Sequence, residues 1–395
     1  MTDTIKRVAV FIGTRPEGIK MAPVIRALTA IPGLEPLVVN TGQHREMLQQ
    51  VLDLFGIRAA RDLSVMKPDQ QLAELTARLL GAVDGVLAEL RPDLALVQGD
   101  TTTVLVAALA CFYRQIPLGH VEAGLRSGDL AAPFPEEANR IIASRLACLH
   151  FAPTEGARQN LLGEGVDDST IEVTGNTVID ALHMEVERQR DPAVDARICA
   201  GLAERLGDDW TEQPFVLITG HRRESFGAGF VEICDALVEL AARFSDHRFV
   251  YPVHLNPNVQ GPVRSRLGSA PNVALIEPVP YSELVALMRR CELVLTDSGG
   301  IQEEAPGLGK PVLVMRDKTE RPEGLAAGTV RLVGPNRERI VDSVSELLTD
   351  RDAYLAMSRA TNPYGDGKAA GRIARRVAKF LGAADGPSAS TAEPR

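Results

Sequence analysis

The sequence predicts an α/β protein built from two Rossmann-like domains that face each other across a cleft. Short apolar segments of strand length alternate with longer helical segments along nearly the whole chain. This alternation is typical of parallel sheets covered by helices on both faces. The alternating series occurs twice, and 395 residues are too many for one ordinary core.

The same alternation gives the expected elements and domain limits. Expected strands lie at 8–13, 36–40, 94–98, 118–122 and 149–152 in the first series, and at 215–219, 247–253, 273–276, 293–296 and 312–315 in the second. Expected helices include 18–30, 45–55, 71–90, 104–113 and a connecting helix over 176–190. The first domain is predicted to span residues 1–176 and the second 177–368. A helix within 369–383 should pack back on the first domain, and the small, polar residues 384–395 should form a disordered tail.

Composition excludes several classes of protein. The formal net charge of -9 argues against a nucleic-acid-binding protein, whose surface should be basic. The longest apolar runs are too short to span a membrane, and residues 1–7 do not resemble a signal peptide. No HExxH or GxSxG motif is present, so neither a metal site nor a Ser-His-Asp hydrolase is predicted. The cysteines lack a CxxC pair and are expected to be buried, reduced thiols, which favours the cytoplasm: Cys111, Cys148, Cys199, Cys234 and Cys291.

A strand, a turn and a helix start at residues 293–305 predict a phosphate-binding site in the second domain. Unpaired N–H groups and the positive end of the helix dipole attract phosphate there. Gly299 and Gly300 let the phosphate approach the backbone, Ser298 adds a donor, and Glu304 could accept from ribose hydroxyls. The alternative is an ordinary strand-to-helix connection. The pattern is neither a dinucleotide fingerprint nor a P-loop, so NAD and ATP are not predicted.

Acidic residues follow successive strands of the first domain, where ligands bind in open α/β sheets. Asp100 follows one buried strand, Glu122 ends the next, and Glu136 lies in the first turn of a helix. The alternatives are that Asp100 caps a helix, that Glu122 pairs with Arg126, and that Glu136 only complements the helix dipole. Clustered carboxylates raise each other's pKa, which suits proton transfer near neutral pH. Together they predict acid–base chemistry.

Cationic residues are expected at the strand ends of both domains. In the segment 13–20, Gly and Pro are expected to shape a tight loop after the first strand, and Arg15 and Lys20 bring cations to the edge of the first sheet. His221 lies in a cationic turn of the second domain, and Arg316 and Arg321 follow a later strand. His254, also at a strand end, could equally be a loop residue that forms a local hydrogen bond. A nucleotide leaving group bound by the second domain, with chemistry on carbon performed by the first, fits this division.

These segments closely resemble the non-hydrolysing UDP-N-acetylglucosamine 2-epimerases of bacteria. The resemblance spans roughly residues 6–380. The matching segments are GTRPEGIK at 13–20, TGQHREM at 41–47, GDTTT at 99–103, HVEAGLR at 120–126, PFPEEANR at 133–140, TGNTVIDA at 174–181, GHRRESFG at 220–227, YPVHLNPNV at 251–259, TDSGGIQEEAP at 296–306 and RPE at 321–323.

The resemblance implies a glycosyltransferase-B type architecture and the interconversion of UDP-N-acetylglucosamine and UDP-N-acetylmannosamine. In the family, UDP leaves carbon 1 as a proton leaves carbon 2, giving 2-acetamidoglucal, and both then return without NAD or a metal. A homodimer is expected by the same analogy.

The resemblance also assigns roles to individual residues. Asp100, Glu122 and Glu136 match the acid–base carboxylates, and Arg15, Lys20 and His221 match groups that stabilise the charge on UDP. Ser298, Gly299 and Gly300 match diphosphate contacts, Glu304 a ribose contact and Arg321 a further nucleotide contact.

Two further positions concern regulation and the base. Some relatives bind a second UDP-N-acetylglucosamine as an activator, which makes Gln43, Arg222 and Arg223 candidate allosteric residues. Near the uracil site, Val279 and Leu284 stand where some relatives have Gln and Phe.

Three alternative functions remain open at this level. They are a hydrolysing 2-epimerase that releases N-acetylmannosamine and UDP, a glycosyltransferase of the same fold, and a non-catalytic nucleotide-sugar sensor. The clustered carboxylates favour the epimerase.

Overall fold

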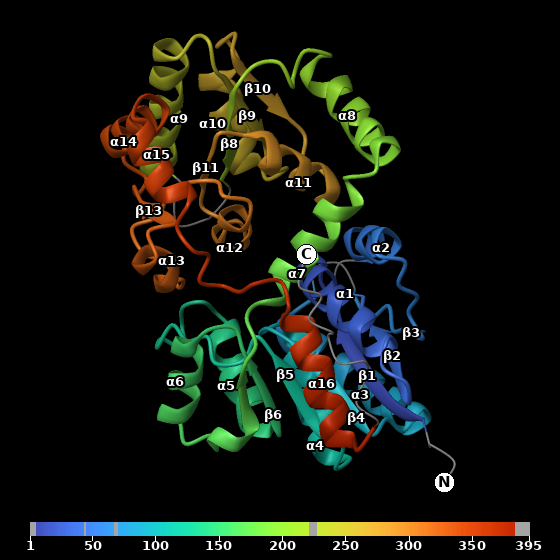
Figure 1. Cartoon of the computed structure of the whole chain (residues 1–395). Helices are drawn as coiled ribbons and strands as arrows, with labels where there is room; N and C mark the ends of the chain where they lie inside the picture. Colours follow the sequence, from blue (N-terminus) through green and yellow to red (C-terminus); the bar gives the residue numbers. More distant parts are fainter. Residues whose placement is uncertain (1–4, 43–44, 67–69, 221–226, 384–395) are drawn as a thin grey trace, which may run out of the picture. The chain divides into compact units, whose positions relative to one another are not determined.

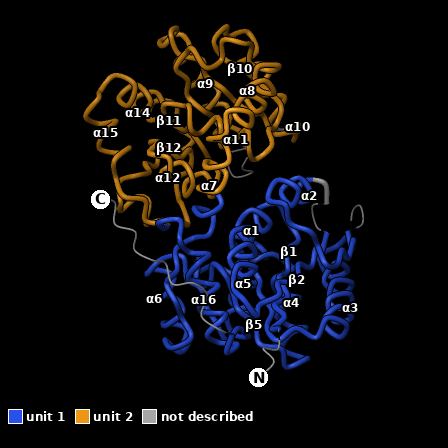
Figure 2. Tube along the Cα trace, turned by 45° about the vertical axis from the view of Figure 1, so that its right-hand side comes forward, with its two compact units in different colours: residues 1–181, 365–395 blue, residues 182–364 orange. Residues whose placement is uncertain are grey.

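The chain folds into two compact α/β units, each with its own parallel sheet. The computed structural model describes residues 5–42, 45–66, 70–220 and 227–383. Unit 1 contains residues 1–181 and 365–395, and unit 2 contains residues 182–364 (Figure 2). The chain leaves unit 1 within helix α7, Thr177–Arg188, and returns between Tyr364 and Gly365. The predicted fold class, α/β with two Rossmann-like domains, is confirmed.

Unit 1 is a seven-stranded parallel sheet in the order β3-β2-β1-β4-β5-β6-β7 (Figure 1). Its strands are β1 Lys6–Ile12, β2 Leu34–Asn40, β3 Arg61–Asp62, β4 Leu94–Gln98, β5 Leu118–Val121, β6 Leu149–Ala152 and β7 Ile171–Val173. Its helices, besides α7, are α1 Arg15–Thr29, α2 Arg45–Leu54, α3 Leu72–Leu90, α4 Thr102–Tyr113, α5 Glu136–Leu146, α6 Glu155–Gly163 and α16 Ala369–Leu381, with a 3-10 turn at Asp168–Thr170.

Helices cover both faces of this sheet because alternate residues of its strands are apolar on both sides. Val8, Val10 and Ile12 of β1 pack with α1, α2 and α16. Ala9 and Phe11 face the other way and pack with α3, α4 and α5. Helix α16 therefore belongs to the core of unit 1 although it follows unit 2 in the sequence.

Unit 2 is a six-stranded parallel sheet in the order β10-β9-β8-β11-β12-β13. Its strands are β8 Phe215–Thr219, β9 Arg248–Pro252, β10 Val273–Ile276, β11 Leu293–Thr296, β12 Val312–Val314 and β13 Val330–Leu332. Its helices are α8 Pro192–Leu206, α9 Ala228–Arg243, α10 Pro257–Leu267, α11 Tyr281–Arg290, α12 Gly299–Gly307, α13 Pro322–Ala326, α14 Arg337–Thr349 and α15 Arg351–Ser358.

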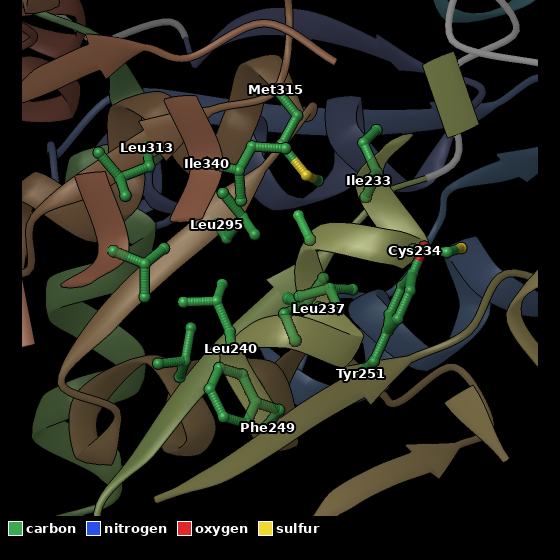
Figure 3. Packing of buried hydrophobic residues seen from close by; sticks show 14 of the residues in the cluster. Ile233, Cys234, Leu237, Leu240, Phe249, Tyr251, Leu295, Leu313, Met315 and Ile340 are labelled. Carbon is green, nitrogen blue, oxygen red and sulfur yellow. The ribbon is translucent and has the colours of Figure 1, made fainter. Parts of the chain in front are cut away.

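The main core of unit 2 lies between its sheet and helices α9, α10 and α14. Figure 3 shows Leu237 and Leu240 of α9 packed with Phe249 of β9 and Leu295 of β11. All four side chains are fully buried. Burial of each is worth roughly 1.5–3 kcal/mol, so this core fixes the strand ends from which the candidate ligand-binding residues project.

Strand order reverses direction between β1 and β4 in unit 1 and between β8 and β11 in unit 2. Ligands of open α/β sheets bind at the carboxyl ends of strands at such switch points. Each unit therefore has one favoured edge. In unit 1 it contains the segments after β1 and β4, and in unit 2 it contains the segment after β11.

Two expectations about the elements were wrong. The first helix was expected to begin at residue 18 after a tight loop, but α1 already begins at Arg15 because Thr14 caps it and Pro16 suits its first turn. Glu122 was expected to end a strand, but β5 ends at Val121 and Glu122 has a φ of 65°. Among the described helices, none combines the length and apolar character that a membrane span requires.

Candidate functional site

The segment after β1 is held by a buried glutamate. Thr14 accepts a hydrogen bond from the Glu17 amide at 3.4 Å, and the Glu17 carboxylate accepts from the amides of Gly13 and Thr14 at 2.6 and 2.7 Å. The same carboxylate accepts from the Thr101 hydroxyl at 2.5 Å. Burial raises the pKa of Glu17, although these hydrogen bonds lower it. Glu17 thus joins the segments after β1 and β4, which position Arg15 and Asp100.

Glu122 lies in a polar socket that contains a lysine. Lys20 Nζ lies 2.5 Å from Glu122 Oε1, and Asn176 Nδ2 donates to the same oxygen at 2.9 Å. Gln98 donates to the other carboxylate oxygen. The fold therefore brings together Lys20 and Glu122, two of the predicted residues, from positions far apart in the sequence.

Arg126 does not pair with Glu122, so that alternative was wrong. Its guanidinium forms a two-pronged pair with Glu164 of α6, with Nε–Oε1 at 2.6 Å and Nη2–Oε2 at 2.9 Å. A surface pocket of about 340 Å³ beside this pair is lined by α5, α6 and residues 126–130. The pocket does not include the predicted carboxylates.

Asp100 pairs with an arginine that the sequence analysis did not single out. Arg140 Nη2 of α5 lies 2.6 Å from Asp100 Oδ2, and the Asn139 amide donates to the Asp100 carbonyl oxygen at 2.8 Å. The expected alternative, that Asp100 caps α4, was wrong because Thr101 occupies the cap position.

The charges around Asp100 connect the predicted carboxylates. Withdrawal from water raises the pKa of Asp100; the charge of Arg140 lowers it, and the charge of Glu122 raises it. Lys20 lowers this pKa and Glu136 raises it to a smaller extent. Glu122 and Glu136 therefore both lie within electrostatic range of Asp100 at one edge of unit 1. Shared charge of this kind keeps a carboxyl group ready to exchange a proton near neutral pH.

Adjacent glutamates at the start of α5 have different environments. Glu137 is buried and accepts from the amides of Ser127 and Gly128 at 3.0 Å, which fixes the preceding segment. Glu136 is only half-buried. Of the two, Glu136 is the one accessible to a ligand.

The side chain of an arginine lies against the first glycine of helix α12 in unit 2. Ser298 is the cap residue of α12, and its amide donates to Thr296 Oγ1 at 2.9 Å. A Cβ atom on Gly299 would lie 2.5 Å from Arg321 Nη1, so only glycine lets this guanidinium rest on the backbone. A helix N-terminus next to a guanidinium group is suited to binding a diphosphate.

Two carboxylates, one of them buried, hold Arg321 in place. Arg321 Nε lies 2.6 Å from Glu303 Oε1, and Arg321 Nη1 lies 2.7 Å from Glu320 Oε1. Glu320 also pairs with Arg316 at 2.8 Å. Burial alone would raise the pKa of Glu320, but the charges of Arg321 and Arg316 outweigh it and lower the pKa to about 2.

Glu304 is buried one turn into α12, and the Tyr281 hydroxyl donates to its Oε1 at 2.9 Å. The carboxylate therefore has a fixed orientation, which a ribose-binding group requires. His254 is exposed and accepts from the Asn256 amide at 3.1 Å, as expected for the loop alternative.

Several predicted residues lie outside the described residues: Gln43, His221, Arg222 and Arg223. Within the described ranges, no group of three or more His, Cys, Asp or Glu side chains is arranged to hold a metal ion.

The structure adds residues that sequence reasoning missed: Glu17, Gln98, Arg140, Asn176 and Glu303. Only Glu17 had a local signal, because Thr14-x-x-Glu17 is a capping box. The others act through contacts with residues distant in the sequence.

Comparisons with known proteins identify the family. The family model for UDP-N-acetylglucosamine 2-epimerase matches residues 26–378. The UDP-N-acetylglucosamine 2-epimerase of Escherichia coli strain K12 is 56% identical over 368 residues, covering 93% of this chain and 97% of that protein. A probable UDP-N-acetylglucosamine 2-epimerase of Ralstonia solanacearum is 55% identical over 377 residues, covering 95% and 100%. The crystal structure of UDP-GlcNAc 2-epimerase from Neisseria meningitidis bound to UDP-GlcNAc has a TM-score of 0.88 at 47% identity, covering 95% and 100%. This chain therefore belongs to the UDP-N-acetylglucosamine 2-epimerase family, a family of isomerases.

Proposed function

We propose that this enzyme interconverts UDP-N-acetylglucosamine and UDP-N-acetylmannosamine without net hydrolysis. The observation that carries the proposal is the cluster of Asp100, Glu122 and Glu136 at the switch-point edge of unit 1, with cations in contact. The solved relative from Neisseria meningitidis binds UDP-GlcNAc.

The proposed reaction proceeds by elimination and re-addition. A carboxylate of the cluster takes the proton from carbon 2, the carbon–carbon double bond of 2-acetamidoglucal forms, and the bond from carbon 1 to UDP breaks with its electron pair on UDP. In the return step an oxygen of UDP attacks carbon 1, and a carboxylic acid of the cluster gives a proton to the other face of carbon 2. The balance needs no oxidant or metal.

Unit 2 is proposed to bind the nucleotide. Gly299 and Gly300 offer backbone N–H groups to the diphosphate and Ser298 adds its hydroxyl group, while Arg321 adds a guanidinium that is already fixed by Glu303. Glu304, oriented by Tyr281, binds the ribose. Groups placed in advance accelerate elimination because they stabilise the charge that accumulates on the leaving diphosphate.

The remaining cations act at the leaving group and at the cluster. By resemblance, Arg15 and His221 stabilise the departing UDP. Lys20 lies against Glu122, and its positive charge also keeps that carboxylate ionised and in position.

Assembly as a homodimer and activation by a second substrate molecule are part of the same proposal. Helix α4 is apolar almost throughout, and Phe112 and Tyr113 at its end are 60% and 66% exposed. A second copy of the chain would cover these two exposed aromatic side chains, because adjacent large apolar side chains on a surface mark an interaction site. Sedimentation analysis of the wild type and of Phe112→Glu should show a dimer converted to a monomer. For activation, the candidate residues are Gln43, Arg222 and Arg223.

The enzyme is proposed to work in the cytoplasm, where reduced thiols persist. All five cysteines are free, including the buried Cys111, Cys234 and Cys291.

Incubation with UDP-N-acetylglucosamine in deuterated water tests the function. We expect both epimers to carry deuterium at carbon 2 at equilibrium, as read by NMR, with no continuing release of UDP. Free UDP that accumulates with turnover would indicate the hydrolysing reaction, and turnover only with an added acceptor would indicate a glycosyltransferase.

A further inference from the structure

We infer that Asn176 is a positioning residue for the carboxylate of Glu122, an inference that rests on the proposed acid–base role of Glu122. The segment 174–181, TGNTVIDA, is one of the matching motifs, yet none of its residues has a role in the reaction proposed above. Its side chains instead connect the cluster to the two segments that cross between the units.

Hydrogen bonds engage both ends of the Asn176 side chain. Its amide nitrogen donates to Glu122 Oε1 at 2.9 Å, and its amide oxygen accepts from the Val178 amide at 3.1 Å. The second bond caps the start of α7. Because a helix cap requires an oxygen, the cap turns the NH₂ end toward Glu122. The side chain is 2% exposed, so water cannot easily replace either bond.

The backbone of Asn176 is also contacted by the segment at Gly365, where the chain returns to unit 1. A Cβ atom on Gly365 would lie 3.3 Å from Gly175 Cα and 3.4 Å from Asn176 N, so the two crossing segments are in close contact. Asp180 of α7 accepts from the amides of Ala369 and Ala370 at 3.2 and 2.9 Å and thereby caps α16. The motif is therefore a rigid support for the amide.

A rigid neutral donor has a specific use beside Glu122. Lys20 reaches the same oxygen through a long, flexible side chain, and Gln98 reaches the other oxygen. Asn176 supplies a donor whose direction is set by a helix start, which restrains rotation of the carboxylate. A base that is misaligned by a fraction of an ångström loses much of its rate.

Two substitutions separate this role from simple capping. Asn176→Ser keeps a capping oxygen but cannot reach Glu122, and Asn176→Asp keeps the cap but places an anion against Glu122. We expect Asn176→Ser to lower kcat about tenfold or more with KM nearly unchanged. Asn176→Asp should lower kcat further.

The pH profile of Asn176→Asp is the decisive measurement. A second carboxylate raises the proton affinity of Glu122, so the limb of the kcat profile that requires an ionised base should move to higher pH. Among the described residues, the charged or titratable groups around Glu122 include Lys20 of α1, Asp100 after β4 and His120 of β5, and the substitution leaves all three in place.

Matched controls come from another helix cap. Asn336 accepts from the Arg339 amide at 3.0 Å at the start of α14, so Asn336→Ser and Asn336→Asp measure the effect of capping alone. Equal effects of the Asn176 and Asn336 variants on kcat, or an unmoved pH profile for Asn176→Asp, would overturn the inference. Glu122→Gln separates the two levels: retained activity there contradicts the proposed acid–base role of Glu122, whereas its loss with an unmoved Asn176→Asp profile contradicts only the role of Asn176.

Discussion

The edges of the two sheets share a topology but use opposite arrangements of charge. In unit 1, cations hold the carboxylates: Lys20 pairs with Glu122 and Arg140 pairs with Asp100. In unit 2, carboxylates hold a cation: Glu303 and Glu320 both pair with Arg321. The same fold therefore presents anions at one edge and cations at the other, because the chemistry resides in side chains grafted on the strand ends.

The comparison also shows how such groups are made rigid. Asp100 and Arg321 each pair with a residue that is itself nearly buried, Arg140 and Glu303 respectively. Removing one member of a buried pair leaves an uncompensated charge and costs roughly 3–5 kcal/mol. Substitutions on the two edges should consequently have different effects, on proton transfer in unit 1 and on nucleotide affinity in unit 2.

The largest effect is expected from Asp100→Asn. Removing the ionisable group from the cluster should lower kcat about 10³-fold, within the range typical of a lost general acid or base. Affinity for UDP, measured by calorimetry, should stay near the wild-type value because Asp100 is not among the proposed nucleotide contacts. Asp84→Asn, at a surface pair with Arg114, is the matched control. Deuterium incorporation at the wild-type rate in Asp100→Asn would contradict the assignment.

A smaller effect is expected from His120: it should make unit 1 lose stability at acidic pH. Burial lowers the pKa of His120 from 6.5 to about 4, although its hydrogen bond to the Gly99 carbonyl raises it. His120 Nε2 lies 2.7 Å from that carbonyl oxygen, so Nε2 carries the hydrogen. A second proton would have to bind at Nδ1, which is buried and has no hydrogen-bond partner among the described residues.

The sign follows from proton uptake. In the unfolded chain His120 is protonated below about pH 6.5, whereas in the native state it is protonated only below about pH 4. The unfolded state therefore binds more protons between these two values, so the free energy of unfolding decreases as the pH falls through this window. The loss from His120 should be about 2 kcal/mol at pH 5.

Hydrogen exchange should show this loss in the strands of unit 1. His120→Gln, which keeps a donor near the Gly99 carbonyl, should reduce the dependence, and the exposed His254→Gln should not. An equal acid dependence in wild type and His120→Gln would remove His120 as its cause.

The smallest effect is expected at the edge of unit 2. Gly299→Ala adds a Cβ atom where Arg321 now rests, so the guanidinium must move from the helix start. We expect UDP to bind about tenfold more weakly, or about 1.4 kcal/mol, with little change in kcat at saturation. Gly261→Ala, where a Cβ atom would meet nothing within 4 Å, is the control in the same unit. Unchanged UDP affinity in Gly299→Ala would show that Arg321 does not contact the diphosphate.

Most of the fold was predictable from local patterns. The expected strands at 94–98, 149–152, 215–219, 273–276 and 293–296 agree with β4, β6, β8, β10 and β11. Each is an apolar run long enough to be distinguished from its neighbours. The edge strands β3, β7 and β13 were missed because each has only two or three residues and at least one of them is charged, so no apolar run marks them; β12 is equally short but wholly apolar.

The sequence by itself determined where the reactive residues lie along the chain, namely at the ends of strands. It also determined the capping box of Thr14 and Glu17, because these two residues are only three positions apart. Only the tertiary structure decided their partners. Lys20 and Glu122 are 102 residues apart, and Asp100 and Arg140 are 40 apart. The reason is physical: a helix or strand depends on interactions between near neighbours, whereas a buried ion pair depends on the order and register in which whole strands assemble.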